Sequence, residues 1–167
     1  MSDKAAPLIA GARAAGLAIA TAESCTGGMI SAAITDVPGS SAVFDRGFVT
    51  YSNAAKQAML GVLAETLDAH GAVSEQVAAE MAAGALAHSL ADLAVAVTGI
   101  AGPGGSEFKP EGRVCFGLAR RGADGRIETV TETVEFGALG RDRVRAATRD
   151  HALTLLLAAL EPRPSAN

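Results

Sequence analysis

Two short apolar runs, each followed at once by a glycine-rich polar turn, constrain the fold of this chain more than any other feature. The run LAIATA covers residues 17–22 and leads into ESCTGG, and the run LAVAVTG covers residues 93–99 and leads into IAGPGG. Continuous apolar runs of this length are typical of strands that are buried on both faces of a sheet. Because such strands need helices as crossovers, the two runs favour an α/β fold.

The remaining segments fit this interpretation. We expect helices at 6–14, from Met29 to about residue 35, from Asn53 as N-cap to about residue 60, at 62–69, after the N-cap Ser74, and at about 140–160. Further strands are predicted at 42–52 and, as a hairpin around RGADG, at 113–120 and 126–136. We therefore predict that residues 1–167 form one three-layer α/β/α domain with a mixed, mostly parallel sheet.

Composition excludes several classes of function. The formal net charge is −4 and no long basic run occurs, so we expect no binding to nucleic acid. No stretch of uncharged apolar residues is long enough to span a membrane, and we expect a soluble cytoplasmic protein. The only cysteines, Cys25 and Cys115, have no close Cys or His partner at metal-ligand spacing. We accordingly predict neither a metal site nor a cofactor.

A tyrosine and a lysine flank a predicted strand-to-helix junction and point to proton transfer. Tyr51 is the only tyrosine in the chain, and Lys56 follows it by five residues, so both can face one pocket. A lysine kept away from water has a lowered pKa and can act as a base. Ser40 or Ser41, just before the same strand, could supply the hydroxyl proton that this base removes. The alternative is that the pair is a packing contact and the serines are turn or cap residues.

The two glycine-rich turns and the start of the last helix are candidates for binding an anion. Gly27, Gly28 and Gly102 allow backbone N–H groups to approach a phosphate or an oxyanion closely. Arg141 and Arg145 lie one helical turn apart and could clamp a phosphate, although RDRVR could also be a solvated helix face. Cys25 with Glu23 offers an alternative nucleophile, although a cysteine in this position could equally be a small buried hydrophobic residue.

Four segments together resemble the CinA C-terminal domain family over about residues 5–160. They are TAESCTGG, GSSAVFDRGFVTYSNAAKQAMLGV, GAVSEQVAAEMAAGAL and VTGIAGPGG…KPEGRVCFGLA, in that order. Stand-alone members of this family are nicotinamide-nucleotide amidohydrolases, or NMN deamidases. They convert nicotinamide mononucleotide to nicotinate mononucleotide and ammonia in pyridine-nucleotide salvage. Longer members carry an additional N-terminal domain, and we expect a chain of 167 residues to be too short to include it.

The resemblance implies a catalytic group of Ser41, Tyr51 and Lys56. It also implies that Ser24, Thr98 and one of the two arginines of RDRVR contact the substrate, without choosing between Arg141 and Arg145. Nicotinamide mononucleotide is then the expected substrate, and a homodimer or higher homo-oligomer is expected. Two other functions stay open: a cysteine amidase that uses Cys25, and a competence-associated nucleotide-binding module without catalysis.

Overall fold

The computed structural model describes residues 3–106 and 108–161 of the chain. In chain order its elements are α1 (Ala5–Ala15), β1 (Ile19–Glu23), α2 (Met29–Thr35), the short 3₁₀ helix η1 (Ser40–Ala42), β2 (Phe44–Val49), α3 (Asn53–Leu60), α4 (Ala64–His70), α5 (Glu75–Ala87), β3 (Leu93–Gly99), β4 (Arg113–Arg121), β5 (Ile127–Glu135) and α6 (Arg141–Leu160). The predicted elements are all present, with ends shifted by a few residues.

Side-chain capping explains where two of the helices begin. The hydroxyl of Ser74 accepts a hydrogen bond from the Val77 N–H at the start of α5, which confirms the predicted cap. Helix α3 is capped by Ser52 rather than by Asn53, because Ser52 has an extended backbone and its hydroxyl accepts from the Ala55 N–H. Asn53 is instead the first helical residue.

The five strands form one mixed sheet in the order β2-β1-β3-β4-β5. β1 pairs in parallel with both β2 and β3, whereas β4 pairs antiparallel with β3 and with β5. β4 is therefore the one described strand that runs against the others, and the prediction of a mixed, mostly parallel sheet is confirmed. The chain passes from β1 to the edge strand β2 and then crosses back over β1 to the central strand β3.

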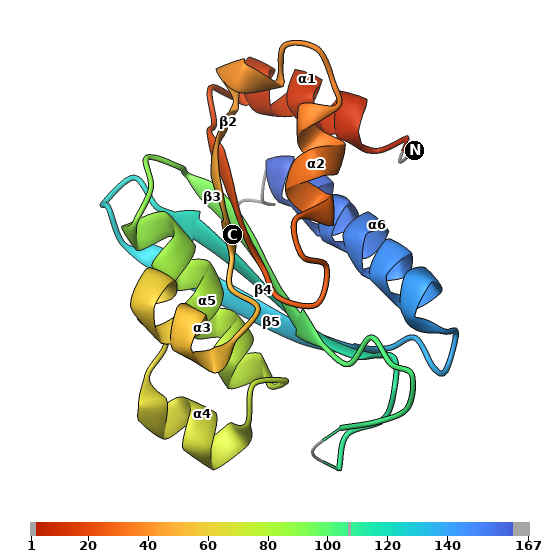
Figure 1. The fold of residues 1–167 in the computed structure, drawn as a ribbon. Coiled ribbons are helices and arrows are strands. Elements are labelled where there is room, and N and C mark those ends of the chain that lie inside the picture. The colour runs from red at the N-terminus through yellow and green to blue at the C-terminus, as the bar shows by residue number, and fades with distance from the viewer. Residues whose placement is uncertain (1–2, 107, 162–167) are drawn as a thin grey trace, which may run out of the picture.

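Helices cover both faces of the sheet and complete the predicted three layers (Figure 1). Helices α1, α2 and α6 lie on one face, and α3, α4 and α5 lie on the other. α5 runs along β3 and β4, and it approaches β4 closely at Gly117. A Cβ atom at that position would lie 2.3 Å from the carbonyl oxygen of Ala78. Glycine is thus required where helix and strand meet.

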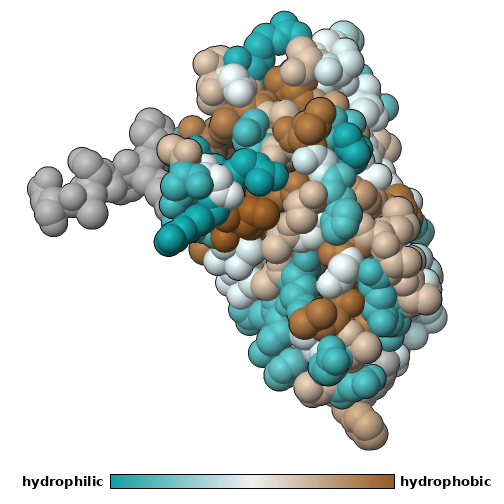
Figure 2. All heavy atoms as spheres, turned by 90° about the vertical axis from the view of Figure 1, so that its left-hand side faces the viewer, coloured by the Kyte–Doolittle hydropathy of each residue, from teal (hydrophilic) through white to brown (hydrophobic). Residues whose placement is uncertain are grey.

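The surface is mixed in character on the side that lies at the left of Figure 1. Figure 2 shows that hydrophobic residues occur there in small groups separated by hydrophilic ones. Within residues 3–106 and 108–161, no helix is both long and apolar enough to pass through a bilayer.

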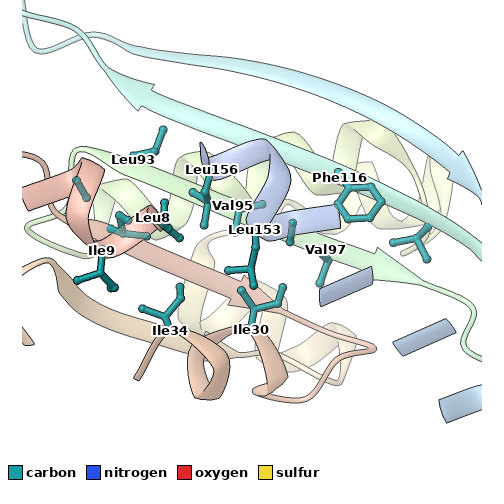
Figure 3. Close-up of a cluster of buried hydrophobic side chains, with 14 of the residues drawn as sticks. Leu8, Ile9, Ile30, Ile34, Leu93, Val95, Val97, Phe116, Leu153 and Leu156 are labelled. Carbon is teal, nitrogen blue, oxygen red and sulfur yellow. The ribbon is translucent and has the colours of Figure 1, made fainter. Parts of the chain in front are cut away.

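Strand alternation divides the core into two parts. Leu93, Val95 and Val97 of β3 point toward α1, α2 and α6, where they pack with leucine and isoleucine side chains (Figure 3). Ala94 and Ala96, the intervening residues, point toward α5. Small side chains on that face let α5 pack close to the sheet. The same alternation continues past the strand ends and determines which way the candidate site residues point.

Candidate active site

The carboxyl ends of the three parallel strands meet at one edge of the sheet. In the strand register, Glu23 of β1 lies opposite both Val49 of β2 and Val97 of β3. Ser24, the residue after β1, consequently lies near the start of the loop after β2 and near Thr98. This edge is also where the chain order reverses around β1, which is the usual binding crevice of an open α/β sheet.

A cavity of about 360 Å³ opens at this edge. Its wall combines the end of β1, the junction between β2 and α3, the loop after β3 and the first residue of α6. The residues that contribute are Ser24, Cys25, Tyr51, Asn53, Lys56, Ala72, Val73, Thr98, Gly99, Ile100, Ala101, Gly102, Pro103, Gly104, Gly105, Ser106 and Arg141. The volume is within the range of small-molecule sites in proteins.

Lys56 lies at the inner wall of this cavity, and its side chain is almost fully buried, with 1 % exposed. Its Nζ lies 3.0 Å from Ser24 Oγ, 3.0 Å from the Thr50 carbonyl oxygen and 3.4 Å from the Tyr51 carbonyl oxygen. Among the residues that the structure describes, no carboxylate forms an ion pair with this amine. A buried lysine without a counter-ion is costly to keep charged.

Burial lowers the pKa of Lys56, because removal from water disfavours the charged ammonium form. The neutral amine has two N–H donors and one lone pair. The carbonyl oxygens of Thr50 and Tyr51 can only accept, so they take the two N–H donors. The lone pair is then left for the hydroxyl of Ser24, which among the three described partners of this amine is the one that can donate to it. The geometry therefore pairs this base with one particular hydroxyl.

Strand alternation separates Ser24 from its neighbour Glu23. Ser24 faces α3 and Lys56, whereas the Glu23 side chain points to the opposite face, toward α2. There the fully buried carboxylate of Glu23 accepts hydrogen bonds from Thr26 Oγ1, from the Ile30 N–H and from both the N–H and the hydroxyl of Ser31. The carboxylate thus anchors the turn after β1 to the start of α2, and it is not free to serve as a base.

Ser41 is not close to Lys56, and this expectation from the sequence is corrected. Ser41 is exposed in η1, at the amino end of β2, whereas Tyr51 and Lys56 follow its carboxyl end. Six strand residues separate the two ends, a length of about 20 Å at the usual rise per residue. The serine that meets the lysine is Ser24, for which the family resemblance implied only a substrate contact.

Tyr51 lines the cavity, but its phenol lies at the rim. The side chain is 61 % exposed, and its hydroxyl accepts a hydrogen bond of 2.9 Å from Arg141 Nη2. Lys56 contacts the backbone carbonyl of Tyr51 and not the phenol. Arg141 Nη1 also donates to the Gly102 carbonyl oxygen at 2.7 Å, so this arginine joins the junction after β2 to the loop after β3.

Some of the other predicted binding residues line the cavity, and the others lie outside it. Thr98 and Gly102 line the cavity, and Thr98 Oγ1 donates to the Ala72 carbonyl oxygen. Gly27, Gly28 and Arg145 lie outside it. Arg145 Nε donates to the Cys25 carbonyl oxygen and its Nη2 to the Thr26 carbonyl oxygen, both at 3.1 Å. The sequence could not distinguish Arg141 from Arg145, but only Arg141 reaches the cavity.

The loop that follows β3 is held in place by one carboxylate. Glu111 accepts hydrogen bonds from the Gly104 N–H at 3.0 Å and from the Gly140 N–H, at the start of α6, at 3.1 Å. Gly102 has a φ of 87°, and a Cβ atom there would lie 2.4 Å from the Glu111 side chain. Glycine at this position therefore lets the loop close against Glu111 and brings Arg141 to the cavity.

Cys25 is poorly suited to act as a nucleophile. Its side chain is only 5 % exposed and packs in the core beside α6. Burial raises the pKa of the thiol to about 11, so the reactive thiolate is scarce at neutral pH. Within the described part of the chain, no group of three or more His, Cys, Asp or Glu side chains is arranged to hold a metal ion.

Sequence reasoning missed the contact between Ser24 and Lys56, and it assigned Asn53 to a cap rather than to the cavity wall. The two residues of the contact are 32 positions apart, on elements that the sequence does not pair. The one signal available was that each follows a predicted strand, because the carboxyl ends of neighbouring parallel strands meet at one edge of a sheet. To infer the contact from that signal, one must also know which strands are neighbours in the sheet.

Comparison with known proteins shows extensive similarity. The CinA C-terminal domain family matches residues 2–160. A protein named nicotinamide-nucleotide amidohydrolase PncC from Escherichia coli K12 is 53 % identical over 145 residues, which is 86 % of this chain and 85 % of that protein. The protein of the same name from Enterobacter agglomerans is 60 % identical over 121 residues, 72 % of this chain and 73 % of that protein.

Longer relatives and solved structures are also similar. A CinA-like protein from Chlorobium phaeobacteroides BS1 is 60 % identical over 119 residues, and the match covers 71 % of this chain but only 28 % of that protein. The crystal structure of the competence/damage inducible protein CihA from Agrobacterium tumefaciens superposes with a TM-score of 0.89 at 49 % identity, covering 95 % of this chain and 94 % of the other.

Proposed function

Because this chain belongs to the CinA C-terminal domain family, we propose that it is an amidohydrolase that converts nicotinamide mononucleotide to nicotinate mononucleotide and ammonia. Relatives that it matches over most of their length bear the name of that activity. The observation that carries the proposal is a buried lysine amine 3.0 Å from a serine hydroxyl at the wall of a cavity. An amide is a poor electrophile, and its hydrolysis needs an activated nucleophile and a proton for the leaving nitrogen.

In the substrate complex, the carboxamide lies over Ser24 and the phosphate lies toward Arg141. The proposal rests on the charges and space around the cavity. Arg141 uses two of its N–H groups within the protein and keeps others for an anion. The glycine-rich stretch 102–105 adds backbone without side-chain bulk beside it. The pyridinium ring of the substrate is cationic and therefore further disfavours the charged form of Lys56.

In the first half of the reaction, Ser24 attacks the carboxamide carbon while the neutral Lys56 amine accepts its proton. The carbonyl oxygen becomes an oxyanion that needs hydrogen-bond donors. Within the described residues, the backbone N–H groups of Cys25 and Thr26 donate to no protein acceptor, and N–H groups directly after a nucleophile are common oxyanion donors. The Lys56 ammonium then protonates the departing nitrogen, which leaves as ammonia, and Ser24 carries the acyl group as an ester.

In the second half, water replaces the amine and the steps run in the same order. Lys56 accepts a proton from water as the hydroxyl attacks the ester carbon. It then returns that proton to Ser24 Oγ, which leaves as the hydroxyl and releases nicotinate mononucleotide. No group besides the serine, the lysine and the backbone donors is required for the proton balance.

The test compares two serines in one assay. Purified protein and its Ser24→Ala and Ser41→Ala variants are incubated with nicotinamide mononucleotide, and ammonia and nicotinate mononucleotide are measured. We expect Ser24→Ala to lower kcat on the order of 10⁴-fold or more, as for other serine nucleophiles. Ser41→Ala, an exposed control of the same chemistry, should stay within about threefold of the parent.

Three results would contradict parts of the proposal. Absence of ammonia from the parent protein would reject the amidohydrolase itself. Normal turnover by Ser24→Ala with loss in Ser41→Ala would return the nucleophile to Ser41. Inactivation by Cys25→Ser with full activity of Ser24→Ala would favour a cysteine amidase instead.

A further inference from the structure

Arg145 of α6 donates hydrogen bonds to the turn that follows Ser24, and it does so from outside the cavity. Its guanidinium is half-buried and donates to two successive backbone carbonyls, those of Cys25 and Thr26, each at 3.1 Å. A planar guanidinium that holds two acceptors at once constrains direction as well as distance. Two of its N–H groups are therefore directed at the protein backbone, and the residue lies outside the cavity.

The hydrogen bond from Arg145 to the Cys25 carbonyl determines the orientation of the Cys25–Thr26 peptide group. A trans peptide is planar, so its N–H points opposite to its carbonyl. With the Cys25 carbonyl held by Arg145, the Thr26 N–H of the same peptide must point away from α6. The preceding peptide is oriented separately, because the Ser24 carbonyl oxygen accepts from the Gly27 N–H at 3.0 Å. One internal bond and one bond from α6 thus orient the two N–H groups that follow the serine.

On either side of this peptide the turn is held by other contacts, because Thr26 Oγ1 donates to Glu23 and the Thr26 carbonyl oxygen also accepts from the Met29 N–H at 3.2 Å. Within the described residues, however, Arg145 is the one group that donates to the Cys25 carbonyl oxygen. Gly27 and Gly28 follow with φ values of 59° and 107°, and glycine has access to many other backbone conformations. Without the bond from Arg145, the Cys25 carbonyl oxygen would have no hydrogen-bond partner among the described residues, and the Cys25–Thr26 peptide could turn so that its carbonyl replaces its N–H. A carbonyl facing the reacting oxygen would repel the developing negative charge instead of stabilising it.

We propose that Arg145 is a positioning residue for the amidase reaction, which locks the Cys25–Thr26 peptide so that the Thr26 N–H stays available to the oxyanion. The inference rests on the proposed function, and it assigns to Arg145 a role different from the phosphate contact expected from the sequence. The two roles differ in what they predict. A phosphate contact mainly lowers KM, whereas an oriented oxyanion donor mainly raises kcat.

The experiment uses Arg145→Met and Arg145→Lys, with Arg143→Met as the matched control, because Arg143 is an exposed arginine on the same helix. All variants are first checked for folding by circular dichroism and thermal unfolding. With nicotinamide mononucleotide, we expect Arg145→Met to lower kcat by about 10²- to 10³-fold, the usual effect of losing one oxyanion donor, with KM within about threefold. Arg145→Lys keeps the positive charge but lacks the planar guanidinium that donates to two carbonyls at once. Its kcat should therefore lie between those of Arg145→Met and the parent protein.

A second readout does not depend on activity. The labelling rate of Cys25 by a thiol reagent, followed by peptide mapping in ligand-free protein, reports how often the turn opens. We expect labelling to be at least about tenfold faster in Arg145→Met than in Arg143→Met, because the clamp that keeps the turn closed is lost.

The outcomes separate the two proposals. If the parent protein releases no ammonia, the proposed function fails, while the labelling rates still show whether Arg145 holds the turn. A raised KM with nearly unchanged kcat in Arg145→Met would overturn the positioning role in favour of a phosphate contact. Unchanged kcat and unchanged labelling would overturn it altogether.

Discussion

Replacing Glu23 by glutamine tests how strongly the turn at the candidate site is anchored. The buried carboxylate accepts two hydrogen bonds on each oxygen: Oε1 from Thr26 Oγ1 at 2.7 Å and the Ile30 N–H at 2.8 Å, and Oε2 from the Ser31 N–H at 3.0 Å and the Ser31 hydroxyl at 2.7 Å. Glutamine has the same shape but replaces one of these oxygens by an NH₂ group, which can only donate.

The size of the effect follows from this arrangement. Whichever way the amide is turned, its NH₂ group faces one backbone N–H, that of Ile30 or that of Ser31, and leaves it unpaired in a buried site. An unpaired buried donor costs about 1–3 kcal/mol. Loss of the negative charge near the start of α2 adds roughly 0.3–1 kcal/mol. We therefore expect Glu23→Gln to lower the free energy of unfolding by about 1–4 kcal/mol.

Urea unfolding at neutral pH, followed by circular dichroism, measures this change. With a slope of about 2 kcal/mol per M urea, the midpoint should fall by about 0.5–2 M. Glu65→Gln removes an exposed carboxylate from α4 and serves as the control, with an expected change within about 0.5 kcal/mol. If Glu23→Gln changed stability no more than Glu65→Gln, the reasoning about the four hydrogen bonds would be refuted.

Two further predictions concern ionisation and the rim of the cavity. Burial lowers the pKa of Lys56, so kcat/KM should rise with pH, with a midpoint below the ordinary lysine pKa of about 10.4. Lys56→Met removes the base and should abolish ammonia release. Between the lowered pKa and about 10.4, the unfolded chain binds more protons at Lys56 than the folded chain does, so the free energy of unfolding rises with pH across that window. A midpoint of the kcat/KM profile at about 10.4 would contradict the buried-base mechanism. Tyr51→Phe removes the hydroxyl that accepts from Arg141, and we expect KM to rise several-fold with kcat within about threefold. A loss of kcat on the order of 10²-fold in Tyr51→Phe would show that the phenol transfers a proton.

Much of the architecture could be predicted from local pattern. The run LAVAVTG forms β3 over the predicted residues, because a continuous apolar run bounded by turns suits a strand covered on both faces. Ser74 caps α5 as predicted, because its hydroxyl accepts from an N–H of the first helical turn. The ends of β2 were less predictable, since its residues are only partly buried and carry a weaker pattern.

The assignment of Ser41 shows where such reasoning fails. Ser41 is near Tyr51 in sequence, but a strand between two residues separates them in space. Ser24 is far from Lys56 in sequence, but β1 lies next to β2 in the sheet, and alternation turns Ser24 toward α3. The two arginines of RDRVR differ in the same way: Arg141 starts α6 at the cavity, and Arg145, one turn further on, meets the turn after β1 instead.

The sequence alone determined the elements, the α/β class and the residue types available for chemistry, because these depend on periodicity, turn preferences and side-chain composition along the chain. Only the tertiary structure decided which serine meets the buried lysine and which arginine faces the cavity. Those contacts depend on strand order and on the face to which each side chain points. A shift of one residue along a strand reverses that face, and neither property is encoded by proximity in sequence.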